Sequence, residues 1–456
     1  MSAVPGGVDT DRQPPMTVPL RHFVVGLGFL LAGAVLGAGA GIGLLPGRGG
    51  LVHVHFLLVG WVCITIMGAM TQFVPVWSNV ALHSRRLANA ALGSVAIGLL
   101  GFGTALSFLP VAWLVPFAGL MLAGFWAFVY NIARTLAGVE HLDVTERHFA
   151  FALGCFLVLT TLGLLLALDL GTSVLSSLPV THAGVLGAHL TVAVFGAVLT
   201  TVYGALYQLG TMFTQTELHG IDHRLRRIEE VGHPLGVALL AAGRLFESAP
   251  VATVGGLSIL VAAFALGAIL LRKLHEMRVE RTPMHTRYAV VALSLTSWAV
   301  ASAPAWLSEP LAPEHYFGAA GSAHLLLAGV IGFVVFGTLY HVVPFVLWVH
   351  TYSDRLGFES VPMIDDLYDD RLAAADGTLL FAGTALFVAS EWVATDPVGP
   401  AVAGVLFVAG VAIFISNMLL AVRRHSPNRL DEVVLGALSP CPGRGSTEGR
   451  IEDARW

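Results

Sequence analysis

The sequence contains little charge of either sign. Only 12% of its 456 residues are Asp, Glu, Lys or Arg, and Lys273 is its one lysine. About a quarter of the residues of a soluble protein are charged, whereas this chain is 56% hydrophobic and has a mean hydropathy of +0.78. The composition therefore excludes a soluble fold and predicts an integral membrane protein that resides in a lipid bilayer.

Cysteine is also scarce, and a strong net charge is lacking. The three cysteines, Cys63, Cys155 and Cys441, form no CxxC or CxxCH motif, which argues against covalent c-type haem and against a thiolate metal cluster. The net charge of −5 gives no electrostatic basis for binding nucleic acid. We therefore expect no nucleic-acid partner.

Long apolar runs fill most of the chain. A membrane helix needs about 20 consecutive apolar residues, and twelve such stretches begin near residues 22, 51, 87, 111, 148, 182, 232, 252, 288, 317, 376 and 399. The first follows a polar leader and lacks a cleavage site, so it is not a signal peptide. We predict an all-α membrane protein of twelve transmembrane helices, with a polar N-terminal leader (1–20), a membrane domain (21–425) and a polar, disordered cytoplasmic tail (426–456).

The basic residues predict an orientation. Arg85 with Arg86, the runs 224–227 and 272–287, and Arg423 with Arg424 all fall in even-numbered loops or after the last helix. Because cytoplasmic loops of membrane proteins are enriched in Lys and Arg, both termini are expected in the cytoplasm. We expect a multi-pass protein of the cell (plasma) membrane.

Three of the apolar stretches repeat one pattern. They start at His53, His189 and His324, and superposing Gly68, Gly204 and Gly337 brings them into register. In that register His53, His189 and Ser322 share one position, and His55, Thr191 and His324 share the position two residues later. The predicted orientation places the histidines in the outer part of the membrane, where a polar ring needs a partner or a function.

Each histidine has alternatives. His53 and His55 are about 200° apart around a helix, so only one of the two is expected to point into the bundle, and the register slightly favours His55. His182 and His189 lie seven apart on one helical face, which suits a shared cavity as well as ordinary packing. His324 follows small residues at a helix start and is the strongest candidate ligand. His233 is expected at the cytoplasmic interface.

The repeated pattern, with Gly337, His341 and Pro344 as its fixed points, resembles the large catalytic subunit of the haem-copper oxidases, including the C-type oxygen reductases and the nitric oxide reductases. That family implies twelve helices in three four-helix arcs. It also implies a low-spin b-type haem, whose iron would be bound by His324 and by His55 or His53. Arg48, in the first outer loop, would replace the arginine pair that meets the haem propionates.

The chain departs from the family at its reactive centre. Ser322 stands where the ligand of the high-spin haem is expected, and a serine hydroxyl is a poor ligand for haem iron. His189 matches one copper ligand, but helix 7 lacks the His-His pair that supplies the others, so only a remnant copper site at His189 and His182 is implied. Helices 2, 6 and 10 also carry no interior Asp, Glu or Lys.

We therefore predict a divergent member of this superfamily with one haem b, used for electron transfer or redox sensing. Its partners would be an electron-donor protein or a quinol and other membrane subunits. Two alternatives stay open: an active terminal oxidase or nitric oxide reductase, which would make the protein an oxidoreductase, and a haem-free transporter or partner subunit on the same helical arcs.

Overall fold

The computed structural model describes residues 14–45, 48–393 and 398–435. Over these residues the chain is helical and contains no strand. Eleven helical segments of the described chain are long and apolar enough to cross a membrane. The prediction of an all-α, multi-pass membrane protein is confirmed at this level.

The helices group into three consecutive units of four. Each unit has a first helix, then a run of consecutive helical segments that we call its central line, and then a pair of antiparallel helices that pack along each other. The first unit contains α1 (Thr17–Gly41), the line α2 (Gly49–His55), η2 (Phe56–Cys63) and α3 (Ile64–Trp77), and the pair α4 (Arg85–Phe108) and α5 (Leu114–Leu136). The second contains α6 (Val144–Thr172), the line α7 (His182–Thr191), η5 (Val192–Leu199) and α8 (Thr200–Thr214), and the pair α9 (Asp222–Leu245) and α10 (Ala249–Glu276). The third contains α11 (Pro283–Ser308), the line η7 (Leu325–Gly332) and α12 (Phe333–Thr351), and the pair α13 (Asp370–Trp392) and α14 (Val398–His425). Short helices in the connections and after α14 are η3 (Val111–Trp113), η4 (Val174–Ser177), η6 (Pro313–His315), η8 (Ser353–Arg355), η9 (Ile364–Leu367) and α15 (Leu430–Leu435).

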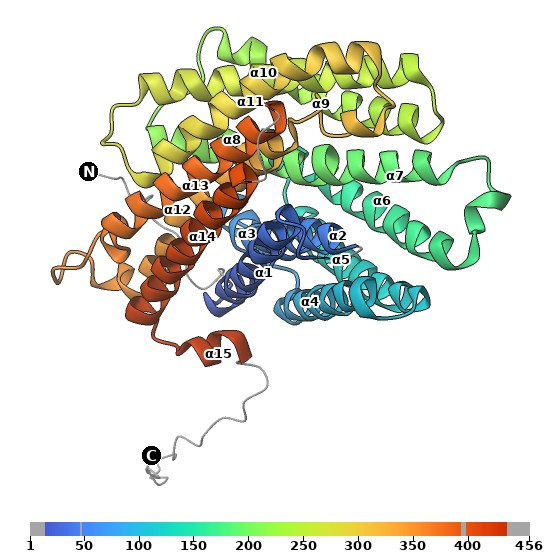
Figure 1. Cartoon of the computed structure of the whole chain (residues 1–456). Helices are drawn as coiled ribbons and strands as arrows, with labels where there is room; N and C mark the ends of the chain where they lie inside the picture. Colours follow the sequence, from blue (N-terminus) through green and yellow to red (C-terminus); the bar gives the residue numbers. More distant parts are fainter. Residues whose placement is uncertain (1–13, 46–47, 394–397, 436–456) are drawn as a thin grey trace.

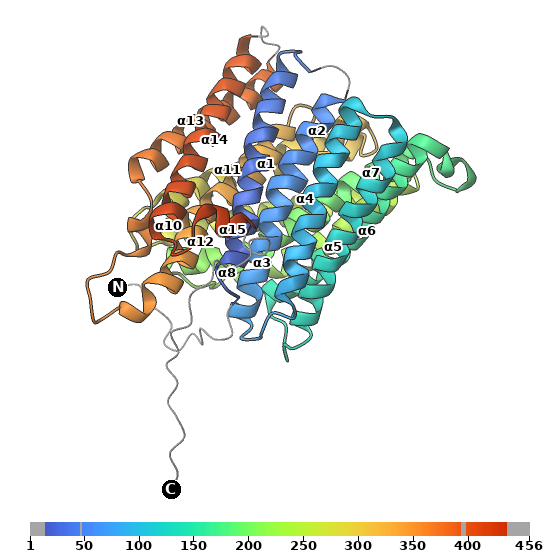
Figure 2. The same ribbon diagram turned by 90° about the horizontal axis from the view of Figure 1, so that it is seen from below.

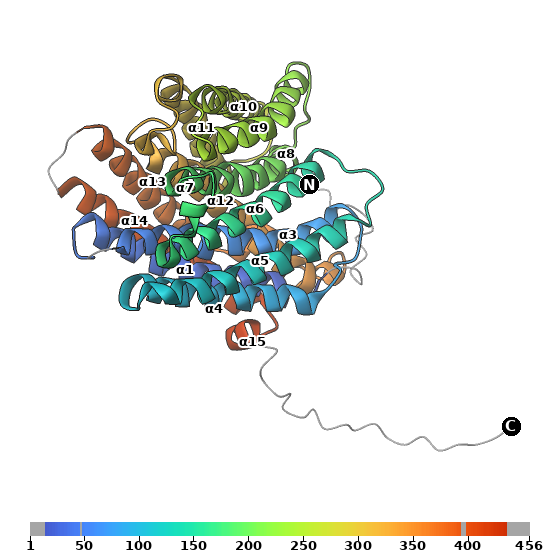
Figure 3. The same ribbon diagram turned by 90° about the vertical axis from the view of Figure 1, so that its right-hand side faces the viewer.

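The three central lines form the core of the bundle. Figures 1 and 3 show α3, α8 and α12 in the middle, with the pairs α4–α5, α9–α10 and α13–α14 on three different sides. The lines His182–Thr214 and Leu325–Thr351 are the most buried of the eleven spans. In these two lines 78% and 83% of the residues of the apolar stretch are buried inside the protein. Seen from below, α1 and α3 to α6 run side by side along a common direction (Figure 2).

A shared glycine fixes where each central line meets the first helix of its unit. A Cβ atom added at Gly68 would lie 2.6 Å from the Cβ of His22, and one added at Gly204 would lie 2.6 Å from the Cβ of His148. At Gly337 the nearest side chains are Tyr288 at 3.1 Å and Arg287 at 3.2 Å. Because small residues let membrane helices approach closely, the register read from the sequence corresponds to one repeated helix crossing.

One of the twelve expected membrane spans, the seventh along the chain, differs from the other eleven. It was predicted to begin near residue 232, but α9 begins ten residues earlier, at Asp222. The added turns carry Arg224, Arg226, Arg227, Glu229 and Glu230, which make the helix too polar to count as a span by composition. Even so, α9 packs along α10 in the same way that α4 packs along α5.

Both predicted polar ends contain ordered structure next to the membrane domain. Helix α1 begins at Thr17, inside the predicted leader, and Val18 and Leu20 are buried. Within the predicted tail, α15 packs against α1, and its Val433 carbonyl accepts a hydrogen bond from Arg21 Nε at 2.7 Å. The prediction that the tail is disordered is therefore wrong for residues 430–435. The remainder of both predictions, residues 1–13 and 436–456, lies outside the described chain.

Candidate functional site

The helix geometry changes next to the candidate histidines in all three central lines. Each line contains an eight-residue π-helical segment, η2, η5 or η7. Each segment begins twelve residues before the shared glycine (68 − 56, 204 − 192 and 337 − 325). His55 and His324 immediately precede η2 and η7. Because π-helical turns are rare and are often found at functional sites, this shared position singles out the histidine end of the lines.

Four histidines at this end have the same hydrogen-bond arrangement. The Nδ1 atom of His53 bonds to the Gly33 carbonyl at 2.7 Å, and that of His55 bonds to the Leu51 carbonyl at 2.8 Å. A carbonyl oxygen can only accept, so Nδ1 carries the proton in both rings and Nε2 carries the lone pair.

The other two histidines repeat this arrangement from the second and third units. His189 Nδ1 donates to the Leu159 carbonyl at 2.9 Å, and His324 Nδ1 donates to Glu391 Oε1 at 2.6 Å. In metal-binding proteins the second ring nitrogen of a ligand histidine almost always donates to such a carbonyl or carboxylate. In the neutral form of each ring, Nε2 is therefore the nitrogen that can coordinate a metal.

Electrostatic interaction links these histidines across the units in two pairs, His53 with His324 and His55 with His189. The His324 ring also stacks on Phe387 of α13 with centroids 4.8 Å apart. This interaction motivates His53 as the partner of His324, whereas the sequence register slightly favours His55.

The non-histidine members of the register are hydrogen-bonded elsewhere. Ser322 is fully buried, and its hydroxyl donates to the Ala319 carbonyl at 2.7 Å. Thr191 donates to the Gly187 carbonyl and accepts a hydrogen bond from Arg244 NH1 at 2.8 Å. Neither hydroxyl is directed toward the histidine pairs by these contacts.

Two predicted site residues lie at the protein surface. His182 is the first residue of α7, and its Nδ1 bonds to Asp169 Oδ2 at 2.8 Å while 45% of its side chain is exposed. This contact joins the start of α7 to the end of α6. Arg48 is exposed at the start of α2.

Two buried polar clusters were missed because their members come from different helices. In the second unit, Glu229 accepts hydrogen bonds from Tyr207 at 2.8 Å and bonds to His148 Nε2 at 3.1 Å. In the third unit, Asp376 accepts hydrogen bonds from Tyr340 and Arg287. Tyr207 and Tyr340 both lie three residues after the shared glycine, so the two clusters are equivalent.

These clusters bring carboxylates to central helices that have none of their own. Glu229 and Asp376 are fully buried and come from the third helix of their units. His233, expected at the membrane interface, is also fully buried; its Nε2 lies 3.0 Å from the Phe195 carbonyl, and its ring packs on Tyr203. The pairing of residues that lie 22 to 89 positions apart on different helices has no local sequence signal.

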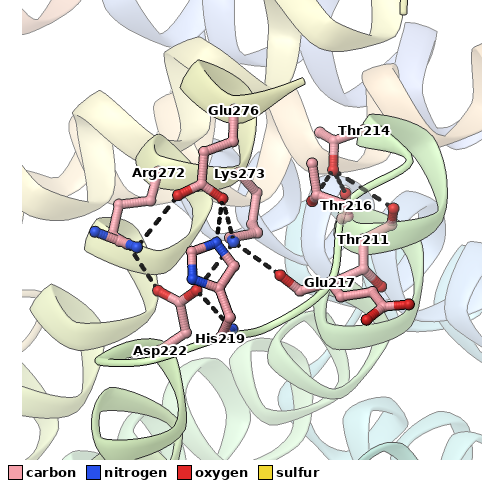
Figure 4. A network of polar contacts seen from close by, with 10 residues as sticks. Thr211, Thr214, Thr216, Glu217, His219, Asp222, Arg272, Lys273 and Glu276 are labelled. Atoms are coloured by element: carbon pink, nitrogen blue, oxygen red, sulfur yellow. Dashed lines mark hydrogen bonds and ion pairs between the residues drawn. The ribbon is translucent and has the colours of Figure 1, made fainter. Parts of the chain in front are cut away.

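A third polar cluster lies at the opposite end of the lines from the histidine pairs (Figure 4). The metal-binding atoms of His219, Asp222 and Glu276 all lie within 4.8 Å of one another. However, the ammonium group of Lys273 bonds to Asp222 at 2.9 Å and also to Glu276. Arg272 pairs with the same two carboxylates, so two positive charges balance two negative ones, and the arrangement is that of an ion-pair cluster rather than a metal site.

Burial and ion pairing have opposite effects on Asp222 in this cluster. Burial raises the pKa of its carboxyl group, but hydrogen bonds from Lys273, the His219 backbone and Arg272 outweigh burial, so the pKa is lowered overall. The carboxylate therefore stays ionised, as its role in the cluster requires.

Comparison with known proteins adds no assignment. No protein-family model and no curated protein matches the chain.

Proposed function

We propose that the protein is a haem-copper-oxidase-like membrane protein that binds a single low-spin b-type haem for electron transfer or redox sensing. The axial ligands in this proposal are Nε2 of His324 and Nε2 of His53. Two neutral imidazoles on opposite sides of the iron give a six-coordinate centre that transfers electrons. An electron-donor protein or a quinol would supply the electrons, with or without further membrane subunits.

The observation that carries the proposal is the orientation of the paired histidines. Both rings of the His53–His324 pair are anchored at Nδ1, by Gly33 and by Glu391, and so present Nε2. A ligand histidine needs this second hydrogen bond to fix its tautomer and its ring orientation.

The packing around His53 fits the same role. A Cβ atom added at Gly37 would lie 2.3 Å from Cε1 of His53, so only glycine lets the ring lie against α1. Ser322 supports a single haem, because a neutral hydroxyl bonded to Ala319 offers iron no strong donor. We leave copper out of the proposal: His182 is paired with Asp169, and among the described residues His189 belongs to no group of three or more His, Cys, Asp or Glu side chains that could hold a metal ion.

We further propose that α9 also crosses the membrane, as the seventh span along the chain, which brings the number of spans to twelve. We propose as well that both termini are cytoplasmic and that the protein resides in the plasma membrane. The distribution of arginine supports this topology. The equivalent packing of the pairs α4–α5, α9–α10 and α13–α14 supports a membrane position for α9, with its apolar part beginning near residue 231.

The test is a reduced-minus-oxidised visible spectrum of the detergent-purified protein, with haem extraction. We expect one haem b per chain, a sharp reduced α-band and no response to carbon monoxide. His324→Ala and His53→Ala are each expected to lose the six-coordinate spectrum. The matched control is His182→Ala, which removes another histidine from the same region and is expected to retain this spectrum.

Three outcomes contradict parts of the proposal. Full haem content and an unchanged spectrum in His324→Ala exclude that ligand. A carbon monoxide shift in the unmodified protein favours an oxygen or nitric oxide reductase. A colourless protein, expressed with haem supplied, favours a transporter or partner subunit.

A further inference from the structure

A cavity of about 70 Å³ lies between the three central lines. The lines contribute equivalent positions to its wall: the residues three and two before the shared glycine, and one, two and five after it. Thus Ala69, Ala205 and Thr338, each one residue after a glycine, all line it. The cavity therefore lies where the three repeats meet.

The first helices of the three units complete the wall in the same repeated way. Phe23 of α1, Phe149 of α6 and Tyr288 of α11 line the cavity. Each lies at the helix crossing made by the shared glycine of its unit: Phe23 and Tyr288 contact that glycine, and Phe149 follows the contacting His148. The cavity is thus a product of the repeated crossing rather than an isolated packing defect.

The wall offers few hydrogen bonds to water. Thr201 donates to the Ala197 carbonyl at 2.8 Å, and Thr338 is bonded to the Tyr288 hydroxyl at 2.8 Å. Most of the other lining residues are aliphatic or aromatic. Because a buried water needs two to four polar partners, apolar cavities stay dry and bind apolar guests instead.

A row of stacked rings lies at the end of the cavity that is distant from the histidine pairs. Phe345 stacks on Phe73 at 6.4 Å, Phe73 on Trp77 at 4.8 Å, and Trp77 on Phe149 at 6.3 Å. Three of these residues, Phe73, Trp77 and Phe149, also line the cavity.

We propose that this cavity binds one small, uncharged, apolar molecule of the size of xenon or a diatomic gas. An engineered cavity of roughly 150 Å³ admits benzene as well as xenon, and this cavity has about half that volume. Its size therefore excludes benzene, and its apolar wall excludes ions and sugars. The site shares no residue with the proposed haem ligands, so the haem spectrum and the cavity are tested independently.

The experiment uses crystals of the full-length protein pressurised with xenon. We expect one anomalous xenon peak between Ala69 and Ala205. Ala205→Ile should remove the peak by filling the space, and Ala374→Ile, on the exposed face of α13, should leave it unchanged. If Ala205→Ile does not fold, Ala69→Val serves as the second filling variant.

A solution measurement gives an independent readout. Ligands that bind only the folded state raise its stability, so xenon but not helium should raise the unfolding midpoint of the native protein, and this gain should vanish in the filling variant. No xenon peak, a peak that persists in the filled variant, or density for an extended lipid chain in the cavity would each overturn the proposal.

Discussion

At the scale of single residues, the contact between Arg287 and Asp376 is the strongest candidate for a stability determinant. Both side chains are almost fully buried, and Tyr340 donates to the same carboxylate. Removing one partner of a buried ion pair costs about 3–5 kcal/mol, because the remaining charge stays buried without compensation. We therefore expect Asp376→Asn to lower the unfolding free energy by about this amount, measured by denaturant-induced unfolding in detergent micelles.

A surface ion pair provides the control for this prediction. Arg355 and Glu359 are about half exposed, and such pairs contribute roughly 0–1 kcal/mol. Glu359→Gln should therefore have a small effect. The double variant Arg287→Met with Asp376→Asn should recover part of the loss. An equal effect of Asp376→Asn and Glu359→Gln would refute the assigned role.

The sequence predicted which histidines recur at one level, but not their hydrogen-bond partners. The recurrence of His53, His189 and His324 follows from aligning three glycines. The acceptors Gly33, Leu159 and Glu391 come from neighbouring helices, up to 67 residues away. Only the packing of these helices determines them.

At the scale of helices, the shared glycines are expected to differ in their tolerance of a methyl group. Gly68→Ala and Gly204→Ala would each place Cβ 2.6 Å from another Cβ, and overpacking of this kind costs about 1–3 kcal/mol. Gly337→Ala should cost less, because its nearest contact would be 3.1 Å. Thermal unfolding of the three variants in one detergent would establish the order.

Gly154 on α6 is the matched control for the glycine series. A Cβ atom there would have no neighbour within 4 Å, and alanine is the better helix former by up to about 1 kcal/mol. Gly154→Ala should therefore be neutral or stabilising. If Gly68→Ala and Gly204→Ala behave in the same way, close approach at the shared crossing is not what selects glycine.

The helices themselves were predictable to different degrees. Long apolar runs predicted the eleven spans, because burial in lipid dominates the choice of residues there. The π-helical segments η2, η5 and η7 were not predicted, since their residues differ little in polarity from the rest of each line. The early start of α9 was missed because charged residues such as Arg224 and Glu229 suggest a loop, although Glu229 is buried and bonded to Tyr207 and His148 in the folded chain.

At the scale of the whole molecule, the two ends of α9 determine the topology. We expect Phe246→Cys, after α9, to react from outside the cell with a membrane-impermeant maleimide, and His223→Cys, at its start, to be protected. Both positions are exposed in the structure. The variants are made with Cys441→Ser, since Cys63 and Cys155 are buried. Labelling of permeabilised cells should then modify both positions.

Labelling of both positions on the same side would mean that α9 does not cross the membrane and that the two termini lie on opposite sides. The sequence alone could not decide this point, because α9 combines a polar first part with an apolar second part. The threefold arrangement of units favours crossing, since α9 occupies the position that α4 and α13 occupy in the other units.

The position of Lys273 gives the folded molecule an unusual chemical property. It is the one lysine of the sequence, and its side chain is 2% exposed within its ion-pair cluster. Reagents that acylate side-chain amines therefore have a single target, which the native fold protects. Acylation of this one amine, separated from that of the chain terminus by mass spectrometry, would report the opening of the bundle without any introduced label.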